Sequence, residues 1–140
     1  MSLLALAAST MLSMAAQPVH TVDLEHRGAT YRVDYRPHVE TRLRTIGMSA
    51  GPRPSTQKCV VTADVSVERV IAAQSGELKA LLPGRQSFSE HLPGSCQGRD
   101  AATIVAGKSE SVGAHLARAA AADRSGALAA IDSAHHFAAN

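Results

Sequence analysis

The sequence predicts an α+β fold, with an N-terminal antiparallel β-meander of about four strands followed by two or three Ala-rich C-terminal helices. Apolar and polar side chains alternate through much of residues 20–68, as expected for strands with one buried face. Residues 101–139 contain no proline, are rich in alanine and repeat apolar residues at helical spacing. Between these two regions, Gly and Pro punctuate residues 74–98.

The chain opens with an apolar stretch that predicts a signal peptide. The first charged side chain is Asp23, and only three hydroxyl residues interrupt the apolar run of residues 3–16. This run has the length of a signal-peptide hydrophobic region and is too short to cross a bilayer about 30 Å thick as a helix. Small side chains at Ser13 and Ala15 match the preference of signal peptidase, so we expect residues 1–15 to be removed.

The alternative interpretation of this stretch is a buried N-terminal helix of a cytosolic protein, because no Lys or Arg precedes the apolar run. If the signal peptide is correct, residues 16–140 form a single periplasmic or secreted domain. No later segment is long and apolar enough to cross a membrane. The formal net charge of +2 gives no general reason to expect a nucleic-acid partner.

Cys59 and Cys96 are the only cysteines in the chain. An isolated pair in an exported protein predicts one structural disulfide. The bridge would close a loop of about 37 residues and stabilise the domain by roughly 3–4 kcal/mol through chain entropy. The sequence has no C-x-x-C motif, so neither a redox-active pair nor covalently attached haem is expected.

The first strands are predicted from period-two alternation. Residues 22–25 and 31–36 alternate around a Gly-containing turn at 27–29, which predicts a hairpin. Pro37 is expected to break the second run, and a third run follows at 39–45.

The most regular strand is predicted at residues 59–68, where the alternation holds for ten residues rich in β-branched side chains. A loop with two glycines and two prolines precedes it at 46–58. Residues 74–98 are predicted to be one irregular loop, since Pro-Gly pairs interrupt it twice. Because Cys96 lies there, the disulfide would attach this loop to the sheet.

The C-terminal helices are predicted from stripes of apolar residues. The first short helix begins near Ala101 and ends near Gly107. Gly126 either separates a second helix from a third or weakens one long helix. Candidate N-cap residues for the second and third helices are Ser109, Ser111, Asp123 and Ser125.

One catalytic motif matches formally. Residues 47–51 read G-x-S-x-G, the nucleophile elbow of α/β-hydrolases, with Ser49 as the candidate nucleophile. That motif requires a parallel strand before the serine and a helix directly after it. Pro52 and Pro54 follow instead, which favours a hairpin loop.

No metal site or cofactor is predicted. The histidines form neither an H-x-x-x-H nor an H-x-H pattern. A long-range pair, such as His26 with His38 across the sheet, stays open. The seven histidines are His20, His26, His38, His91, His115, His135 and His136.

A group of arginines predicts an anion-binding surface on the sheet. Tyr31 and Tyr35 are expected to point away from this surface, which disfavours nucleic acid because no aromatic side chain would stack on bases. The alternative is a solvated face whose charges discourage aggregation. The candidate residues are Arg32 and Arg36 on one strand face, Arg42 and Arg44 on another, and Arg53 in the nearby loop.

These observations favour a small exported binding or structural protein without enzymatic activity. Its expected partner is an anionic envelope polymer or another protein. The alternative is a small serine hydrolase that uses Ser49.

Overall fold

The computed structural model describes residues 17–139, so the predicted signal peptide lies outside the described residues. Five strands precede two helices, and this arrangement confirms the predicted α+β class. The elements are β1 (His20–His26), β2 (Ala29–Ile46), β3 (Lys58–Ala73), β4 (Gly76–Leu81), β5 (Gln86–Pro93), α1 (Ala101–Ala106) and α2 (Ser109–Ala138).

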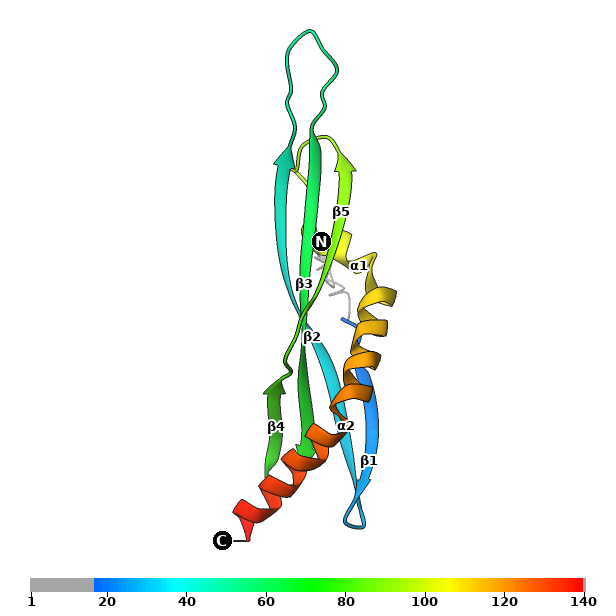
Figure 1. Cartoon of the computed structure of the whole chain (residues 1–140), viewed down its shortest axis with the longest axis vertical. Helices are drawn as coiled ribbons and strands as arrows, with labels where there is room; N and C mark the ends of the chain where they lie inside the picture. Colours follow the sequence, from blue (N-terminus) through cyan, green and yellow to red (C-terminus); the bar gives the residue numbers. More distant parts are fainter. Residues whose placement is uncertain (1–16, 140) are drawn as a thin grey trace, which may run out of the picture.

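All strand pairs are antiparallel, and the sheet is long and strongly twisted (Figure 1). β3 lies at the centre of the sheet. β2 pairs with one side of β3, and both β4 and β5 pair with its other side; β1 pairs with the outer side of β2. β5 pairs with residues 58–65 of β3, whereas β4 pairs with residues 68–73. We call the end that contains β5 the upper half and the end that contains β1 and β4 the lower half.

β2 runs unbroken through Pro37, so the predicted break there is wrong. Pro37 lies opposite Val67, whose carbonyl oxygen accepts a hydrogen bond from the Leu82 amide on the far side of β3. In an antiparallel pair the backbone groups of one residue point to the same side, so those of Pro37 and Val67 point away from each other. A proline at this position therefore removes no hydrogen bond between β2 and β3.

The segment predicted to be one irregular loop, residues 74–98, instead contains β4 and β5. Its Pro83-Gly84 and Pro93-Gly94 pairs lie at strand ends. The alternation of β5 was hard to recognise, because its inward positions include Gln86 and Glu90. Both polar side chains are held from the helical side, by Arg118 and Lys108 respectively.

The predicted third helix is not separate, because α2 is continuous for 30 residues and includes Gly126. Asp123 and Ser125 therefore lie inside the helix and cap nothing. Asp100 caps α1, where its carboxylate accepts hydrogen bonds from the Ala102 amide at 3.0 Å and the Thr103 hydroxyl at 2.7 Å.

α2 packs across the lower half of the sheet and buries most of the core there (Figure 1). Tyr35 is 1% exposed beneath it, and Tyr31 packs against the same cluster, which confirms that both point toward the helix. The buried cluster consists of Leu24, Val33, Tyr35, Val67, Ile71, Leu116, Ala120, Ala127 and Ile131.

Candidate functional site

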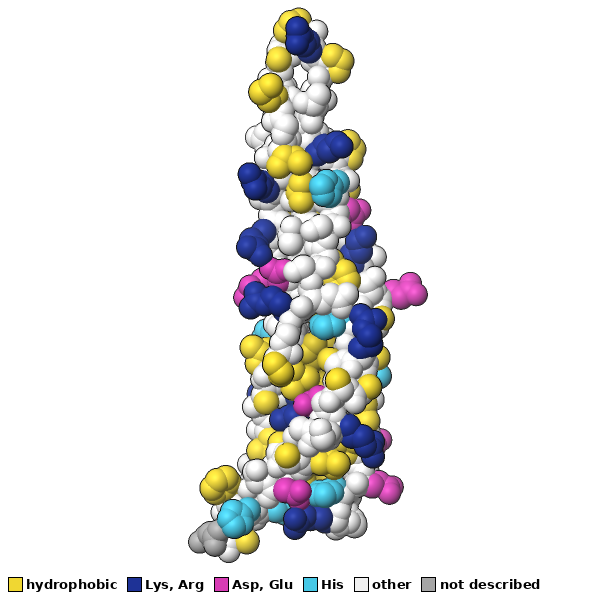
Figure 2. Space-filling model, viewed as in Figure 1, with side chains coloured by type: hydrophobic (Ala, Val, Ile, Leu, Met, Phe, Trp, Pro, Cys, Tyr) yellow, Lys and Arg dark blue, Asp and Glu magenta, His cyan; other side chains and the backbone are white. Residues whose placement is uncertain are grey.

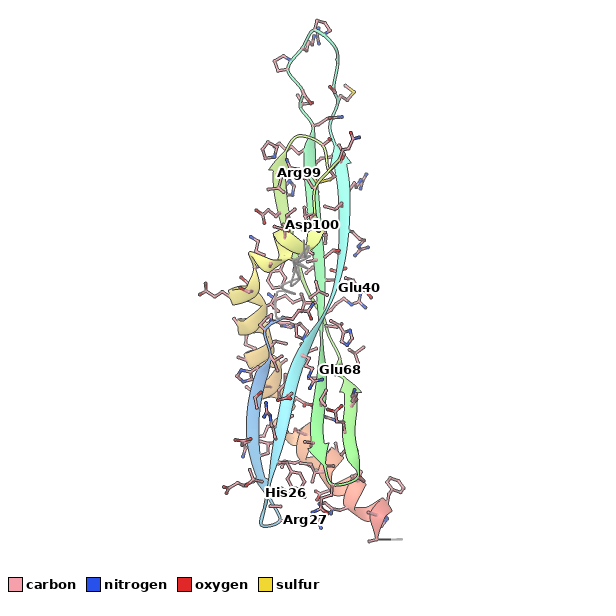
Figure 3. All side chains as sticks on the ribbon, turned by 180° about the vertical axis from the view of Figure 1, so that it is seen from behind. His26, Arg27, Glu40, Glu68, Arg99 and Asp100 are labelled. Carbon is pink, nitrogen blue, oxygen red and sulfur yellow. A yellow bond between two sulfur atoms is a disulfide. The ribbon has the colours of Figure 1, made fainter. Side chains whose placement is uncertain are left out.

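Three strands form one uncovered surface on the upper half of the sheet. The register pairs Arg44 with Val60 and Val60 with His91, so all three point outward from adjacent strands. Seen from behind, α1 and the preceding loop with Arg99 and Asp100 lie over the opposite face (Figure 3). We call the uncovered surface the cationic face; its basic members are Arg42, Arg44, Lys58 and His91, and its hydroxyl members are Thr62, Ser87 and Ser89.

Positive charge is concentrated in the upper half. Residues 38–65 and 85–108 carry seven Lys and Arg against four Asp and Glu. The remaining described residues carry seven basic against eight acidic side chains, so the excess of positive charge lies entirely at the upper end. Figure 2 shows Lys and Arg side chains along the upper part of the molecule, while Asp and Glu lie mainly toward its middle and lower parts.

A buried carboxylate lies within the cationic face. Asp64 is 6% exposed, because the Arg42 guanidinium and the Ser87 hydroxyl both donate hydrogen bonds to it. These bonds, chiefly the one from Ser87, hold the pKa of Asp64 below its ordinary value of 3.8. Asp64 therefore balances the charge of Arg42, whereas Arg44 and Lys58 have no ion-pair partner among residues 17–139.

Arg32 and Arg36 do not join the cationic face. They share the outward side of β2 with Arg42, contrary to the predicted division between two strand faces, because β2 is one continuous strand. Both lie in the lower half, where Arg32 Nε is 3.2 Å and Arg36 Nη2 is 3.4 Å from the oxygens of Asp34. The pKa of Asp34 is lowered. The hydrogen bond from Thr21 contributes most to this, and the hydrogen bonds from the two arginines add to it. This carboxylate offsets much of their positive charge.

The loop at residues 47–57 extends the β2–β3 hairpin beyond the sheet (Figure 1). The Thr56 amide donates to the Met48 carbonyl at 3.0 Å, which keeps the two sides of the loop together. Gly47 has a φ of 89°, and a Cβ there would lie 2.5 Å from the Thr56 carbonyl oxygen, so only glycine fits. This loop holds Arg53, which is exposed, beyond the upper end of the cationic face.

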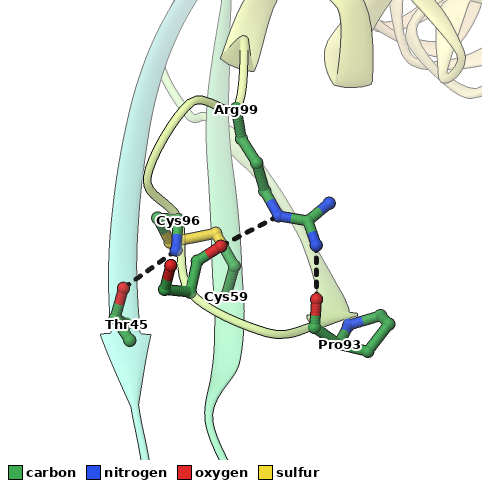
Figure 4. Close-up of a disulfide and its surroundings, with 6 residues drawn as sticks. Thr45, Cys59, Pro93, Cys96 and Arg99 are labelled. Atoms are coloured by element: carbon green, nitrogen blue, oxygen red, sulfur yellow. Dashed lines mark hydrogen bonds between the residues drawn. A yellow bond between two sulfur atoms is a disulfide. The ribbon is translucent and has the colours of Figure 1, made fainter.

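The predicted disulfide between Cys59 and Cys96 is present, with Cα atoms 4.8 Å apart. It ties the segment after β5 to the side of β3 opposite the cationic face (Figure 4). The Cys96 amide donates to the Thr45 hydroxyl at 3.0 Å, and the Arg99 guanidinium donates to the Pro93 carbonyl. The cross-link therefore fastens the covering on one face and leaves the cationic face open.

Ser49 lies in the loop that joins the antiparallel strands β2 and β3, and no helix follows it. The strand–turn–helix geometry of a nucleophile elbow is therefore absent at this serine. Within the part of the chain that is described, no side-chain hydrogen bond links Ser49 to a histidine that would act as its base.

The histidines are dispersed over the molecule. His26 Nε2 lies 2.8 Å from Asp132, and His135 Nε2 lies 2.6 Å from the Tyr31 hydroxyl. His26 is at the lower tip of the sheet (Figure 3), whereas His38 is near the middle of β2, so this pair does not form a site. Residues 17–139 contain no group of three or more His, Cys, Asp or Glu side chains placed to hold a metal ion.

Sequence reasoning missed a polar cluster beneath α2. Arg69 Nη1 donates to both oxygens of Asp123, at 2.9 and 3.0 Å, and the Tyr35 hydroxyl donates to the same carboxylate at 3.1 Å. Burial, followed by the charge of Asp123, raises the pKa of Tyr35 to about 12. The cluster fixes the helix on the sheet. Tyr35 is on the inward side of the predicted alternation, and extending the pattern of residues 59–68 by one residue would have put Arg69 on that side as well.

Comparison with protein-family models, curated proteins and solved structures found no match for this chain. Within the described range, no helix is long and apolar enough to cross a membrane. The disulfide is compatible with an extracellular location.

Proposed function

We propose that this chain is an exported, non-enzymatic binding protein that holds an anionic polymer on its cationic face. The observation that carries the proposal is that Arg44 and Lys58 lie on an uncovered sheet surface without ion-pair partners among the described residues. Arg32 and Arg36, by contrast, are partnered by Asp34. Unpaired cations attract anionic groups more strongly than neutralised ones do.

The spacing of the groups suits a polymer with repeated charges. Arg42 and Arg44 are two residues apart on one strand, which separates their side chains by about 7 Å. Arg44 and His91 lie two strands apart, or about 10 Å. A linear polymer with a carboxylate or sulfate on each repeat can engage several of these groups at once, and such multiple contacts raise the total affinity.

Hydroxyl groups complete the surface. Thr62 and Ser89 are register partners whose oxygen atoms lie 3.5 Å apart, between the basic side chains. They offer donors and acceptors for sugar hydroxyls. The outward positions of the three strands hold no Phe, Tyr or Trp between Glu40 and Ile46 or opposite them. Since aromatic anchors dominate protein–protein hot spots, this composition favours a polymer over a folded protein on this face.

We place the protein in the periplasm or outside the cell. Two features support this location: the apolar stretch expected to be a signal peptide, and the disulfide between Cys59 and Cys96. Disulfides persist in oxidising compartments and are rare in the cytosol. Anionic polysaccharides of the cell envelope are available there as partners.

Retention on immobilised heparin, eluted with a salt gradient, tests the proposal. We compare the double variant Arg44→Ala/Lys58→Ala with the control Arg32→Ala/Arg36→Ala, because each loses two positive charges. The first should elute at clearly lower salt than the second, and the second close to the wild-type protein. Equal shifts would mean that only net charge matters and that the face is merely solvated. An unretained wild-type protein would also overturn the proposal.

A further inference from the structure

The upper part of β2 is an open sheet edge. β1 pairs only with residues 29–35 of β2, and residues 36–46 pair with β3 alone. Figure 1 shows the upper part of β2 with no strand on its outer side. We propose that this edge binds an extended peptide with alternating apolar and acidic residues, which adds to the sheet as a further strand.

Two prolines explain why β1 begins where it does. The register pairs His20 with Tyr35, so the next pair that would exchange hydrogen bonds is Pro18 with Pro37. Neither residue has a backbone N–H, so neither hydrogen bond of that pair can form. β1 consequently begins at His20, and the edge of β2 above Pro37 is left without a paired strand among the described residues.

The free backbone groups on this edge follow from the register. The Leu82 amide donates to the Val67 carbonyl and the Gly94 amide to the Gln57 carbonyl, so odd-numbered residues of β3 face β4 and β5. Even-numbered residues of β3 therefore bond to even-numbered residues of β2. The amides and carbonyls that point to the open edge are those of Val39, Thr41, Leu43 and Thr45.

The side chains along the edge specify the character of the added strand. Val39 and Leu43 point to the helical side, and Leu43 is 39% exposed, so apolar side chains of a peptide can pack beside them. Arg44, which has no ion-pair partner among the described residues, and Arg42, which Asp64 balances, point to the cationic face, so the peptide side chains beside residues 42–44 meet net positive charge. Opposite charges on adjacent strands stabilise the pair.

The same charges disfavour a second copy of this chain as the occupant. In a symmetric antiparallel pairing of two β2 edges centred on Leu43, Arg42 of one copy would lie beside Arg44 of the other. Like charges on neighbouring strands are destabilising and are a common protection against edge-to-edge association. An acidic peptide meets no such repulsion.

The first experiment measures binding of a fluorescent nine-residue peptide in which valine alternates with glutamate. Thr41→Pro removes an edge amide while keeping the bonds to β3, as Pro37 already does. We expect Thr41→Pro to weaken binding at least tenfold, and the control Thr41→Val, which keeps the amide, to change it less than threefold. A peptide with lysine in place of glutamate should bind at least tenfold more weakly. Equal binding by both threonine variants would overturn the proposal.

The second experiment needs no substitution. Amide hydrogen exchange, followed by NMR, should be fast at Val39, Thr41, Leu43 and Thr45 in the free protein and slower at these four with saturating peptide. Unchanged exchange in the presence of bound peptide would contradict strand addition. Slow exchange already in the free protein would mean that the edge is occupied by another part of the chain or by a second copy, and this result would contradict it too.

The two proposals can fail separately. Thr41→Pro should leave heparin retention unchanged, because its side chain lies on the helical side and not on the cationic face. If the wild-type protein binds the peptide but is not retained on heparin, the cationic face has been wrongly assigned. If it is retained on heparin but does not bind the peptide, the open edge of β2 has been wrongly assigned.

Discussion

Arg69 on β3 and Asp123 on α2 meet between the sheet and the helix, where they are only 10% and 13% exposed as side chains. The Tyr35 hydroxyl donates to the same carboxylate from β2. One residue from each of three elements thus forms the polar contact that positions α2 over the lower half of the sheet.

Removing the carboxylate should be strongly destabilising. Asp123→Ala leaves the Arg69 guanidinium buried without its counter-ion, and breaking a buried pair in this way typically lowers the free energy of unfolding by about 3 kcal/mol or more. Urea unfolding followed by circular dichroism measures the loss. Asp132→Ala is the control, because Asp132 is 42% exposed where it pairs with His26 and the exposed Arg27, and its effect should be much smaller. Similar losses in both variants would contradict a buried role for Asp123.

The protein should lose stability between pH 10 and pH 12. Tyr35 has a pKa of about 12 in the folded protein, raised from 10.0, so the unfolded chain releases this proton first. The contribution is complete below pH 10 and is lost as the pH rises toward 12, by about 3 kcal/mol in total. Tyr35→Phe should have a shallower fall over this window in urea titrations. An identical pH dependence in both proteins would show that Tyr35 titrates normally.

Two glycines of α2 should respond oppositely to alanine. A Cβ at Gly126 would lie 2.6 Å from Asp123 Oδ1 and 3.3 Å from Arg69 Nη1, whereas one at Gly113 meets nothing within 4 Å. Gly113→Ala should raise the free energy of unfolding by about 0.5–1 kcal/mol through helix propensity. Gly126→Ala should lower it, because the added methyl group displaces the Asp123–Arg69 pair. Stabilisation of similar size by both substitutions would contradict the close approach at Gly126.

Loss of the disulfide should destabilise the domain. The 37-residue loop it closes predicts a decrease of about 3–4 kcal/mol in the free energy of unfolding for Cys59→Ser/Cys96→Ser. Thermal unfolding of the variant, compared with that of the disulfide-bonded wild-type protein, measures this decrease. The reduced wild-type protein is the control and should be as stable as the variant. A change below about 1 kcal/mol would mean that Arg99 and Thr45 hold the segment after β5 without the bridge.

The strand pattern and the cysteine pair were predictable because each depends on local sequence. Alternation identified β1 and most of β3, and the compartment suggested by the first residues favoured the disulfide. Pro37 was misinterpreted, because its effect depends on whether its amide would face β3 or the open edge, which only the register decides. Asp123 has the chemistry of a helix cap, but its partner, Arg69, is 54 residues away in the chain.

The candidate site was predictable in composition but not in its limits. The sequence identified five arginines, yet no local rule distinguishes Arg36, neutralised by Asp34, from Arg44, which faces Val60 across the strand pair. Lys58 and His91 were missed as members of the surface. They join it only because β5, predicted to be loop, pairs with β3.

Titration of the ¹⁵N-labelled protein with a heparin oligosaccharide tests the role of the cationic face most directly. We expect the largest NMR shift changes at Arg44, Lys58 and His91, a reduced response in 0.5 M salt as screening requires, and little change at Arg32 and Arg36. Equal shifts at Arg32 and Arg44, or changes centred on the lower half of the sheet, would contradict it.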